Sequence, residues 1–172
     1  IKLKQNGAKG LVLDLRGNPG GLLDETVQVA SQFLKDGLVL YEVDGKGNRV
    51  DWKIRRGGIA LDLPLAVLVD SGSASGSEVL AGALQDYGRA PLIGTQTYGK
   101  GSVNIMRRLS DGSGLYITIA HWYTPKGNLI EGAGLNPDIE VLLTAEDRRI
   151  GKDPQLDRAV QYVREKLAQG IP

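Results

Sequence analysis

Ser75 and Lys100 are the two residues of this sequence whose types could act together as a nucleophile and a base. Ser75 follows an apolar run that predicts a buried strand, and it precedes residues with the spacing of an amphipathic helix. Backbone N–H groups are unpaired at the start of a helix, so the N–H of Gly76 could face the negative charge that develops on a substrate carbonyl. Acyl transfer at Ser75 would require this arrangement.

The same serine also has a purely structural interpretation. Ser75 to Glu78 read Ser-x-x-Glu ahead of an apolar run, which is the pattern of a capping box at a helix start. Three further hydroxyl groups lie close by in the sequence, and spacing does not choose among the four serines: Ser71, Ser73, Ser75 and Ser77.

Lys100 lies between two glycines directly after a predicted strand. A lysine accepts a proton near neutral pH only if burial lowers its pKa by about 3 units. Flanking glycines would let the backbone pack closely and bury the side chain. The alternative is an ordinary surface lysine in a loop.

A phosphate-binding loop is a second interpretation of the same segment, because residues 94–100 match G-x-x-x-x-G-K. Gly101 stands where a hydroxyl should hold Mg²⁺, and residues 103–109 predict a strand instead of the helix that would receive phosphate. We therefore expect no nucleotide.

Composition removes several other kinds of site. The chain has no cysteine, which excludes disulfides, thiolate metal sites and cysteine nucleophiles. Its single histidine, His121, falls on the apolar face of a predicted strand together with Leu115, Ile117, Ile119 and Tyr123, and we interpret it as a hydrogen-bonded structural histidine. We expect neither a metal nor an organic cofactor.

Charge and length bound the partners and the domain count. The net charge is +1 with the signs interspersed, which gives no reason to expect nucleic acid or anionic lipid as a partner. The 172 residues suit one domain, and no segment is apolar enough to span a bilayer. The first residue is Ile1, with no signal-peptide pattern behind it, so we expect a fragment or a processed piece.

The order of the predicted elements indicates an α/β fold, because strand, turn and helix alternate as in a sheet with parallel neighbours. The predicted strands are 10–15 and 65–69, both buried on two faces, and 90–94. Hairpins are predicted over 38–54 and 103–124. The predicted helices cover 22–36, the residues after Ser75, and a last segment from Asp153 that buries Leu156, Ala159, Val160, Val163 and Leu167.

Three blocks of the sequence resemble a known family in the same order. They are GLVLDLRGNPGGLL at 10–23, VLVDSGSASGSEVLAGALQDYGRAPLIGTQTYGKGSVN at 67–104 and YTPKGNLIEGAGLNPDIEV at 123–141. They are similar to the carboxyl-terminal processing peptidases, or tail-specific proteases, which are serine proteases with a Ser-Lys pair. The resemblance covers about residues 8 to 141 and implies a crotonase-like (Clp protease-like) core of βαβ units with added β hairpins.

By position, the resemblance makes Ser75 the nucleophile and Lys100 the general base. It implies an oxyanion hole formed by the N–H of Gly76 and a glycine of the turn after the first strand, either Gly20 or Gly21. Family members commonly have a glutamine that orients the lysine, and its position holds Asn104 here. Four residues of strand span about 13 Å, so Asn104 reaches Lys100 only if the chain bends at Gly101.

The resemblance implies an endopeptidase that cleaves protein substrates near their C-terminus through an acyl-enzyme and needs no cofactor. It also implies a PDZ domain and a first part of the core upstream, so we interpret residues 1–172 as a catalytic-core fragment that we expect to be inactive or unregulated alone. The implied compartment is the bacterial periplasm or cell envelope, or the thylakoid lumen of a plastid. The alternative is a catalytically inactive module that binds a peptide or ligand on the same fold.

Overall fold

The structure is a computed structural model that describes residues 2–170. Its helices are α1 (Lys2–Gln5), α2 (Leu23–Ala30), α3 (Gly76–Asp86), α4 (Ala145–Arg149) and α5 (Pro154–Ala168). Its strands are β1 (Leu11–Asp14), β2 (Leu38–Asp44), β3 (Arg49–Lys53), β4 (Leu65–Val69), β5 (Leu92–Gly94), β6 (Ser102–Arg108), β7 (Gly114–Tyr123) and β8 (Ile139–Glu140).

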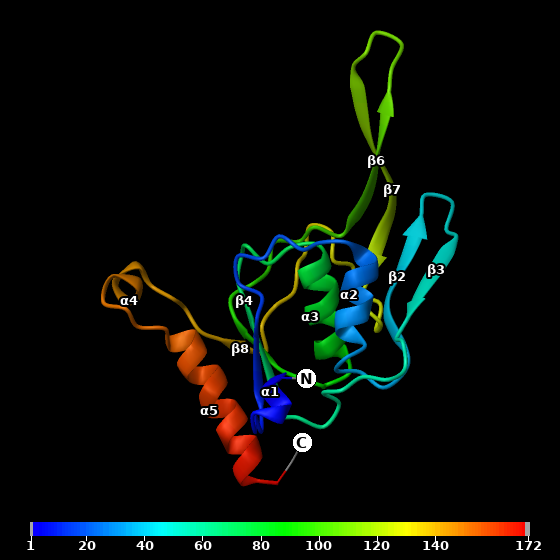
Figure 1. Cartoon of the computed structure of the whole chain (residues 1–172). Coiled ribbons are helices and arrows are strands. Elements are labelled where there is room, and N and C mark those ends of the chain that lie inside the picture. The colour runs from blue at the N-terminus through cyan, green and yellow to red at the C-terminus, as the bar shows by residue number, and fades with distance from the viewer. Residues whose placement is uncertain (1, 171–172) are drawn as a thin grey trace.

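A parallel sheet with strand order β1-β4-β5-β8 forms the centre of the chain. Helices α2 and α3 cover one face of this sheet and α5 covers the other (Figure 1). All five residues of β4 are buried, and they alternate between the two faces. Val67 and Val69 belong to the core under α2 and α3, whereas Ala66 and Leu68 pack with Ala159 of α5. The α/β fold that the sequence predicts is confirmed.

An antiparallel sheet with order β3-β2-β7-β6 extends from this body. Figure 1 shows the β6–β7 hairpin projecting beyond the other elements. Only the base of the hairpin is covered: Ala120 and Trp122 are buried, whereas Leu115 and Tyr116 near the tip are 50% and 74% exposed. Both hairpins that the sequence predicts are present.

The structure corrects the predicted strand faces. β1 is only half-buried, instead of buried on both faces, because it is the edge strand of its sheet and has a neighbour on one side alone. At the base of β7 the face turned to the core carries Ala120 and Trp122, so His121 lies on the opposite, half-buried face. The apolar face predicted for this strand is therefore the wrong one.

Two helices also differ from their predictions. α2 ends at Ala30 and not near residue 36, and the Ser31 hydroxyl donates to the Val27 carbonyl oxygen at 2.6 Å where the helix stops. α5 begins as predicted, with Asp153 as its N-cap, but Leu156 and Leu167 are 39% and 40% exposed. None of the helices within residues 2–170 is both long and apolar enough to cross a membrane.

Candidate active site

Ser75 lies in the turn between β4 and α3 and has an unusual backbone conformation. Its φ is 56° and its ψ is −120°, and it is the one non-glycine residue with a positive φ in the described part of the chain. A side chain in this region costs about 1–3 kcal/mol, a strain that is concentrated at functional sites. Ser75 is half-buried at the N-terminus of α3, next to the backbone of Gly76.

The other three serines of this segment have different surroundings. Ser73 is fully buried, and its hydroxyl donates to the Leu15 carbonyl oxygen at 2.7 Å and accepts from the Asp70 N–H at 3.0 Å. Ser77 is buried inside α3, and Ser71 is exposed in the turn. Ser73 therefore joins the turn after β1 to the turn after β4.

Lys100 lies in an irregular segment between β5 and β6 that packs closely against residues 130–134. A Cβ atom on Gly99 would lie 3.0 Å from the Gly134 nitrogen, and one on Gly101 would lie 2.5 Å from the Glu131 nitrogen. The two glycines thus allow the close packing that the sequence predicts. The side chain of Lys100 is nevertheless exposed, so the burial that a neutral lysine requires is absent in this chain.

Glu78 connects the segment of Ser75 to the segment of Lys100. Its carboxylate is completely buried, and one oxygen accepts from the Ser75 N–H at 2.9 Å and the Lys100 N–H at 2.8 Å. The other oxygen accepts from the Gly99 N–H at 2.7 Å and the Thr97 hydroxyl at 2.5 Å. A buried carboxylate is stable only when its oxygens are hydrogen-bonded, and four donors satisfy this one.

Further hydrogen bonds hold the lysine segment in place. The Tyr98 N–H donates to the Ser73 carbonyl oxygen at 3.0 Å, directly linking the segment to the serine turn. The Thr97 hydroxyl, which donates to Glu78, also accepts from the Leu135 N–H at 2.8 Å. The backbone around Lys100 is therefore fixed relative to Ser75 from several sides.

The turn after β1 brings Gly20 and Gly21 beside the start of α3. Gly20 has a φ of +96°, and a Cβ atom there would lie 2.6 Å from the Gly76 nitrogen. A Cβ atom added to Gly76 would lie 3.2 Å from the Gly21 nitrogen, so the two backbones are close together. The Gly20 N–H donates to the Asn18 side-chain oxygen at 2.9 Å, and the Asn18 carbonyl accepts from the Ala74 N–H at 3.0 Å.

A pocket of about 330 Å³ opens beside these glycines. Gly20, Gly21 and Gly76 form part of its wall, and apolar side chains from β1, α2 and α3 form much of the rest, among them Leu13, Leu15, Leu22, Val29 and Leu80. Glu25 of α2 also lines the pocket and is an acidic residue. A peptide at Ser75 would have this apolar space next to it.

Asn104 makes its contacts along the hairpin. Its side-chain oxygen accepts from the Thr118 hydroxyl at 2.7 Å, and its amide nitrogen donates to the Ser102 hydroxyl at 3.2 Å. A bulge in the β6–β7 ladder lies between Val103 and Asn104. The oxygen that would orient Lys100 is thus bonded to Thr118, and orientation of the lysine by Asn104 stays a prediction.

The sequence pattern indicates that Glu78 is part of a capping box, but it does not reveal the hydrogen bonds of Glu78 with residues 97, 99 and 100. The signal was a glutamate within an otherwise small and apolar helix segment, Gly76–Leu84, every residue of which is buried. The phosphate-loop interpretation fails in the structure for the predicted reason, because strand β6 and not a helix follows Lys100. Within residues 2–170 no group of three or more His, Cys, Asp or Glu side chains is placed to hold a metal ion.

The chain is similar in fold to a solved serine-protease structure. The chain superposes on the photosystem II D1 C-terminal processing protease with a TM-score of 0.76 and 41% sequence identity, over 81% of this chain and 36% of that one. The fold is therefore the Clp-protease-like fold of that peptidase. Residues 1–141 match the family described as peptidase family S41, and the chain belongs to this family of serine proteases.

Two curated relatives agree with this membership. The carboxy-terminal-processing protease of Bartonella bacilliformis is 44% identical over 158 residues, which cover 90% of this chain and 36% of that protein. The carboxyl-terminal-processing protease of a Synechocystis species is 44% identical over 137 residues, covering 80% of this chain and 32% of that protein. The chain spans about a third of the length of these relatives.

Proposed function

We propose that this chain carries the catalytic pair of a serine endopeptidase that cleaves protein substrates near their C-terminus. The observation that carries the proposal is the buried carboxylate of Glu78, which accepts hydrogen bonds from the backbone N–H groups of both Ser75 and Lys100. A scaffold that served only to bind a ligand would have no need to fix these two residues relative to each other. The names of the relatives, which are processing proteases, support the same reaction.

In the proposed reaction the Ser75 oxygen attacks the substrate carbonyl carbon while its proton passes to the Lys100 amine. The tetrahedral oxyanion receives hydrogen bonds from Gly76 and from Gly21 or Gly20. Gly20 can contribute only after its N–H leaves the Asn18 side chain, whereas no such bond has to break at Gly21. Collapse expels the amine, which takes the proton from Lys100, and water then hydrolyses the ester on Ser75 by the same steps.

The pocket beside Gly20 and Gly76 supports an apolar residue just before the cut. Burying one aliphatic side chain there would contribute about 1.5–3 kcal/mol to binding, enough to place the following carbonyl over Ser75. We therefore propose unstructured proteins with apolar C-terminal tails as the substrates.

Water has to be excluded from the exposed Lys100 side chain before its amine can act as a base, because removal from water favours the neutral form of a lysine. We propose that bound substrate and further parts of the whole protein, including a PDZ domain, supply this cover. We also propose an extracytoplasmic setting, in the periplasm, the cell envelope or a thylakoid lumen, since one structural relative processes the D1 protein of photosystem II.

The experiment compares cleavage of an unstructured protein with an apolar C-terminus by the whole protein and by its Ser75→Ala and Lys100→Ala variants. Each change should lower kcat by about 10³-fold or more. Matched controls are Ser71→Ala in the same turn and Lys46→Ala in the β2–β3 turn, both at exposed positions, which should leave the rate unchanged. Cleavage that survives both active-site changes would overturn the assignment, and peptide binding without any cleavage would favour the binding module.

A further inference from the structure

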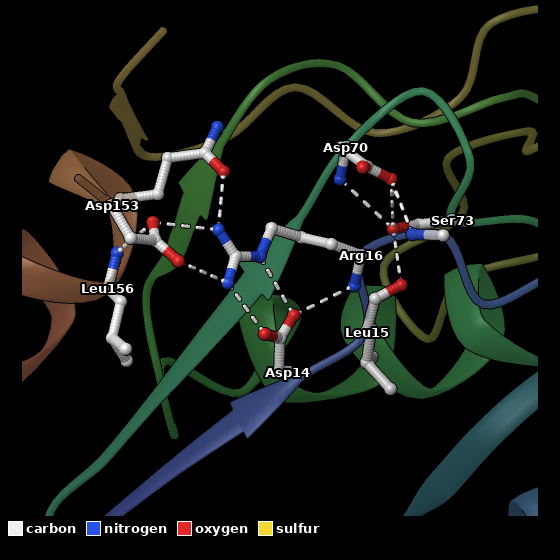
Figure 2. A network of polar contacts seen from close by, with 9 residues as sticks. Asp14, Leu15, Arg16, Asp70, Ser73, Asp153 and Leu156 are labelled. Atoms are coloured by element: carbon white, nitrogen blue, oxygen red, sulfur yellow. Dashed lines mark hydrogen bonds and ion pairs between the residues drawn. The ribbon is translucent and has the colours of Figure 1, made fainter. Parts of the chain in front are cut away.

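The N-terminal end of α5 reaches the turn that carries Gly20 and Gly21 through a single arginine. Arg16 follows β1, and its guanidinium lies between Asp14 of β1 and Asp153, the residue that caps α5 (Figure 2). The match to the family model ends at residue 141, before α5 begins. This contact joins the start of α5 to the turn after β1.

All five N–H donors of the Arg16 guanidinium are used. The Asp14 carboxylate accepts two, at 2.9 and 2.7 Å, and the Asp153 carboxylate accepts two, at 2.9 and 2.8 Å. The side-chain oxygen of Gln155 accepts the fifth at 3.0 Å. Arg16 is 15% exposed, and paired, charge-assisted bonds of this kind fix the direction of a side chain.

Gln155 is itself held in one orientation. It is 2% exposed, and its amide nitrogen donates to the Val141 carbonyl oxygen at 2.8 Å, which leaves its oxygen facing Arg16. Asp153 likewise accepts from the Leu156 N–H at 2.9 Å as the helix cap (Figure 2). The start of α5 therefore presents two fixed acceptors to Arg16.

Arg16 is followed directly by the turn that meets Ser75. The Gly17 N–H donates to the Asp70 carboxylate at 2.8 Å, and the Asn18 carbonyl accepts from the Ala74 N–H at 3.0 Å. On the other side of Arg16, the Leu15 carbonyl accepts from the Ser73 hydroxyl at 2.7 Å (Figure 2). A shift of Arg16 would move the turn after β1 relative to the serine turn.

These polar contacts are separate from the packing that holds α5 on the sheet. Ala159 and Val163, one and two turns further along, pack against Ala66, Leu68 and Ile93. The apolar contact is the main attachment of the helix, because fully buried aliphatic area contributes more to stability than an ion pair that is partly open to solvent. The contacts of Asp153 and Gln155 with Arg16 are therefore not the main attachment of α5.

We propose that Asp153 and Gln155 are positioning residues of the peptidase site: acting through Arg16, they hold the Leu15–Gly21 turn in the place where its glycine N–H stabilises the oxyanion at Ser75. This inference rests on the proposed peptidase function. It makes α5 part of the active-site support, although the helix lies on the far face of the sheet from α3.

The test uses Asp153→Asn and Gln155→Ala in the whole protein, with Asp157→Asn as the matched control. Asparagine remains a good helix cap, so Asp153→Asn removes the charge while the cap is kept. Asp157 is an exposed aspartate one turn further along α5, so the control makes the same chemical change away from Arg16. The three readouts are kcat and KM for peptide cleavage, the melting temperature, and amide hydrogen exchange at Gly17 and Ala74.

We expect Asp153→Asn and Gln155→Ala each to lower kcat about 10-fold with KM changed less than twofold, because small displacements of a catalytic donor are costly. Exchange at Gly17 and Ala74 should be about 10-fold faster than in Asp157→Asn. Wild-type kcat and exchange in both variants would overturn the proposal, as would an equal loss in Asp157→Asn. If the wild-type protein cleaves nothing, the peptidase function fails, and unchanged exchange would still refute the link from α5 to the turn.

Discussion

The carboxylate of Glu78 and the backbone N–H of Lys100 are 2.8 Å apart, and the same carboxylate oxygen is 2.9 Å from the N–H of Ser75. A single atom therefore joins the proposed nucleophile and the proposed base through their main chains. Glu78 is completely buried, so we assign it a positioning role and not contact with substrate. Its burial makes the arrangement rigid, because hydrogen bonds without competing water hold their partners in place.

Replacing Glu78 by glutamine tests this relationship. One oxygen then has to be an amide NH₂ group, which faces backbone N–H groups that are themselves donors. We expect the free energy of unfolding to fall by about 2–4 kcal/mol, since buried donors lose their acceptor, and kcat to fall at least 10²-fold as a rough lower bound. Urea unfolding and peptide cleavage measure the two effects.

The matched control for this change is Glu140→Gln in β8, at an exposed position. It should alter stability by less than about 0.5 kcal/mol. If Glu78→Gln were as mild as this control, the carboxylate would not be what holds Ser75 and Lys100 together.

The backbone of Ser75 predicts an unusual order of stability for its variants. Glycine adopts φ 56° and ψ −120° without strain, whereas alanine does not. The free energy of unfolding of Ser75→Gly should therefore exceed that of Ser75→Ala by at least about 1 kcal/mol. Both variants are expected to be inactive. Ser77, the second residue of α3, has no positive φ, so glycine relieves no strain there and the order should reverse because alanine is the better helix former. Thermal unfolding of the four variants decides, and the same order at both positions would argue against strain at Ser75.

The turn after β1 should tolerate a methyl group at one glycine and not at its neighbour. A Cβ on Gly20 would lie 2.6 Å from the Gly76 nitrogen and 2.7 Å from the Ala74 oxygen, whereas one on Gly21 meets nothing within 4 Å. Gly20→Ala should lower kcat by about 10²-fold, comparable to losing an oxyanion donor, and Gly21→Ala should stay near wild type. Equal activity of the two variants in a cleavage assay would contradict the close approach.

The ion pairs of Arg16 predict how stability depends on acid. Hydrogen bonding to Arg16 holds the pKa of Asp153 below its usual value. For Asp14, burial alone would raise the pKa, but the hydrogen bonds and the charge of Arg16 outweigh burial, and the pKa of Asp14 is lowered as well. A carboxylate whose pKa is lower in the folded protein than in the unfolded chain stabilises the fold above the unfolded pKa of about 4. This stabilisation is lost as the pH falls through the pKa of the folded protein. Asp153→Asn should therefore be less stable than wild type at pH 7.

The stability difference between the two proteins should shrink as the pH falls from about 4, where Asp153 of the unfolded chain is protonated, and it should vanish once the pH is below the lowered pKa of Asp153 in the folded protein. Urea unfolding at several pH values between neutral and strongly acid measures this. A difference that stays constant down to the lowest pH would show that the charge of Asp153 does not stabilise the fold.

The sequence predicts the place of Ser75 and Lys100 but not the means by which they are held. Local pattern places Ser75 at a strand-to-helix turn, and the structure agrees. The bonds from Glu78 to Gly99 and Lys100 join residues 21 and 22 positions apart, which no periodicity reveals. The exposure of Lys100 also could not be predicted, because burial depends on what else surrounds the segment.

The sequence predicts an element best where both the spacing of its apolar residues and the length of the segment are clear, as for β4 and α3. Errors arose where tertiary position overrides pattern. β1 has the apolar composition of a buried strand but lies at a sheet edge, and β7 turns Trp122 inward although its aliphatic residues occupy the other face. Neither the edge position nor the choice of face is encoded within the strand itself.

Locating the acyl group is the most direct test of the central claim that Ser75 is the nucleophile. The whole protein is mixed with an activated ester of a short apolar peptide and quenched in acid, and the adduct is mapped by tandem mass spectrometry. The added acyl mass is expected on Ser75 in the wild type and should be lost in Ser75→Ala. An adduct on Ser71, Ser73 or Ser77, or ester turnover that persists unchanged in Ser75→Ala, would contradict it.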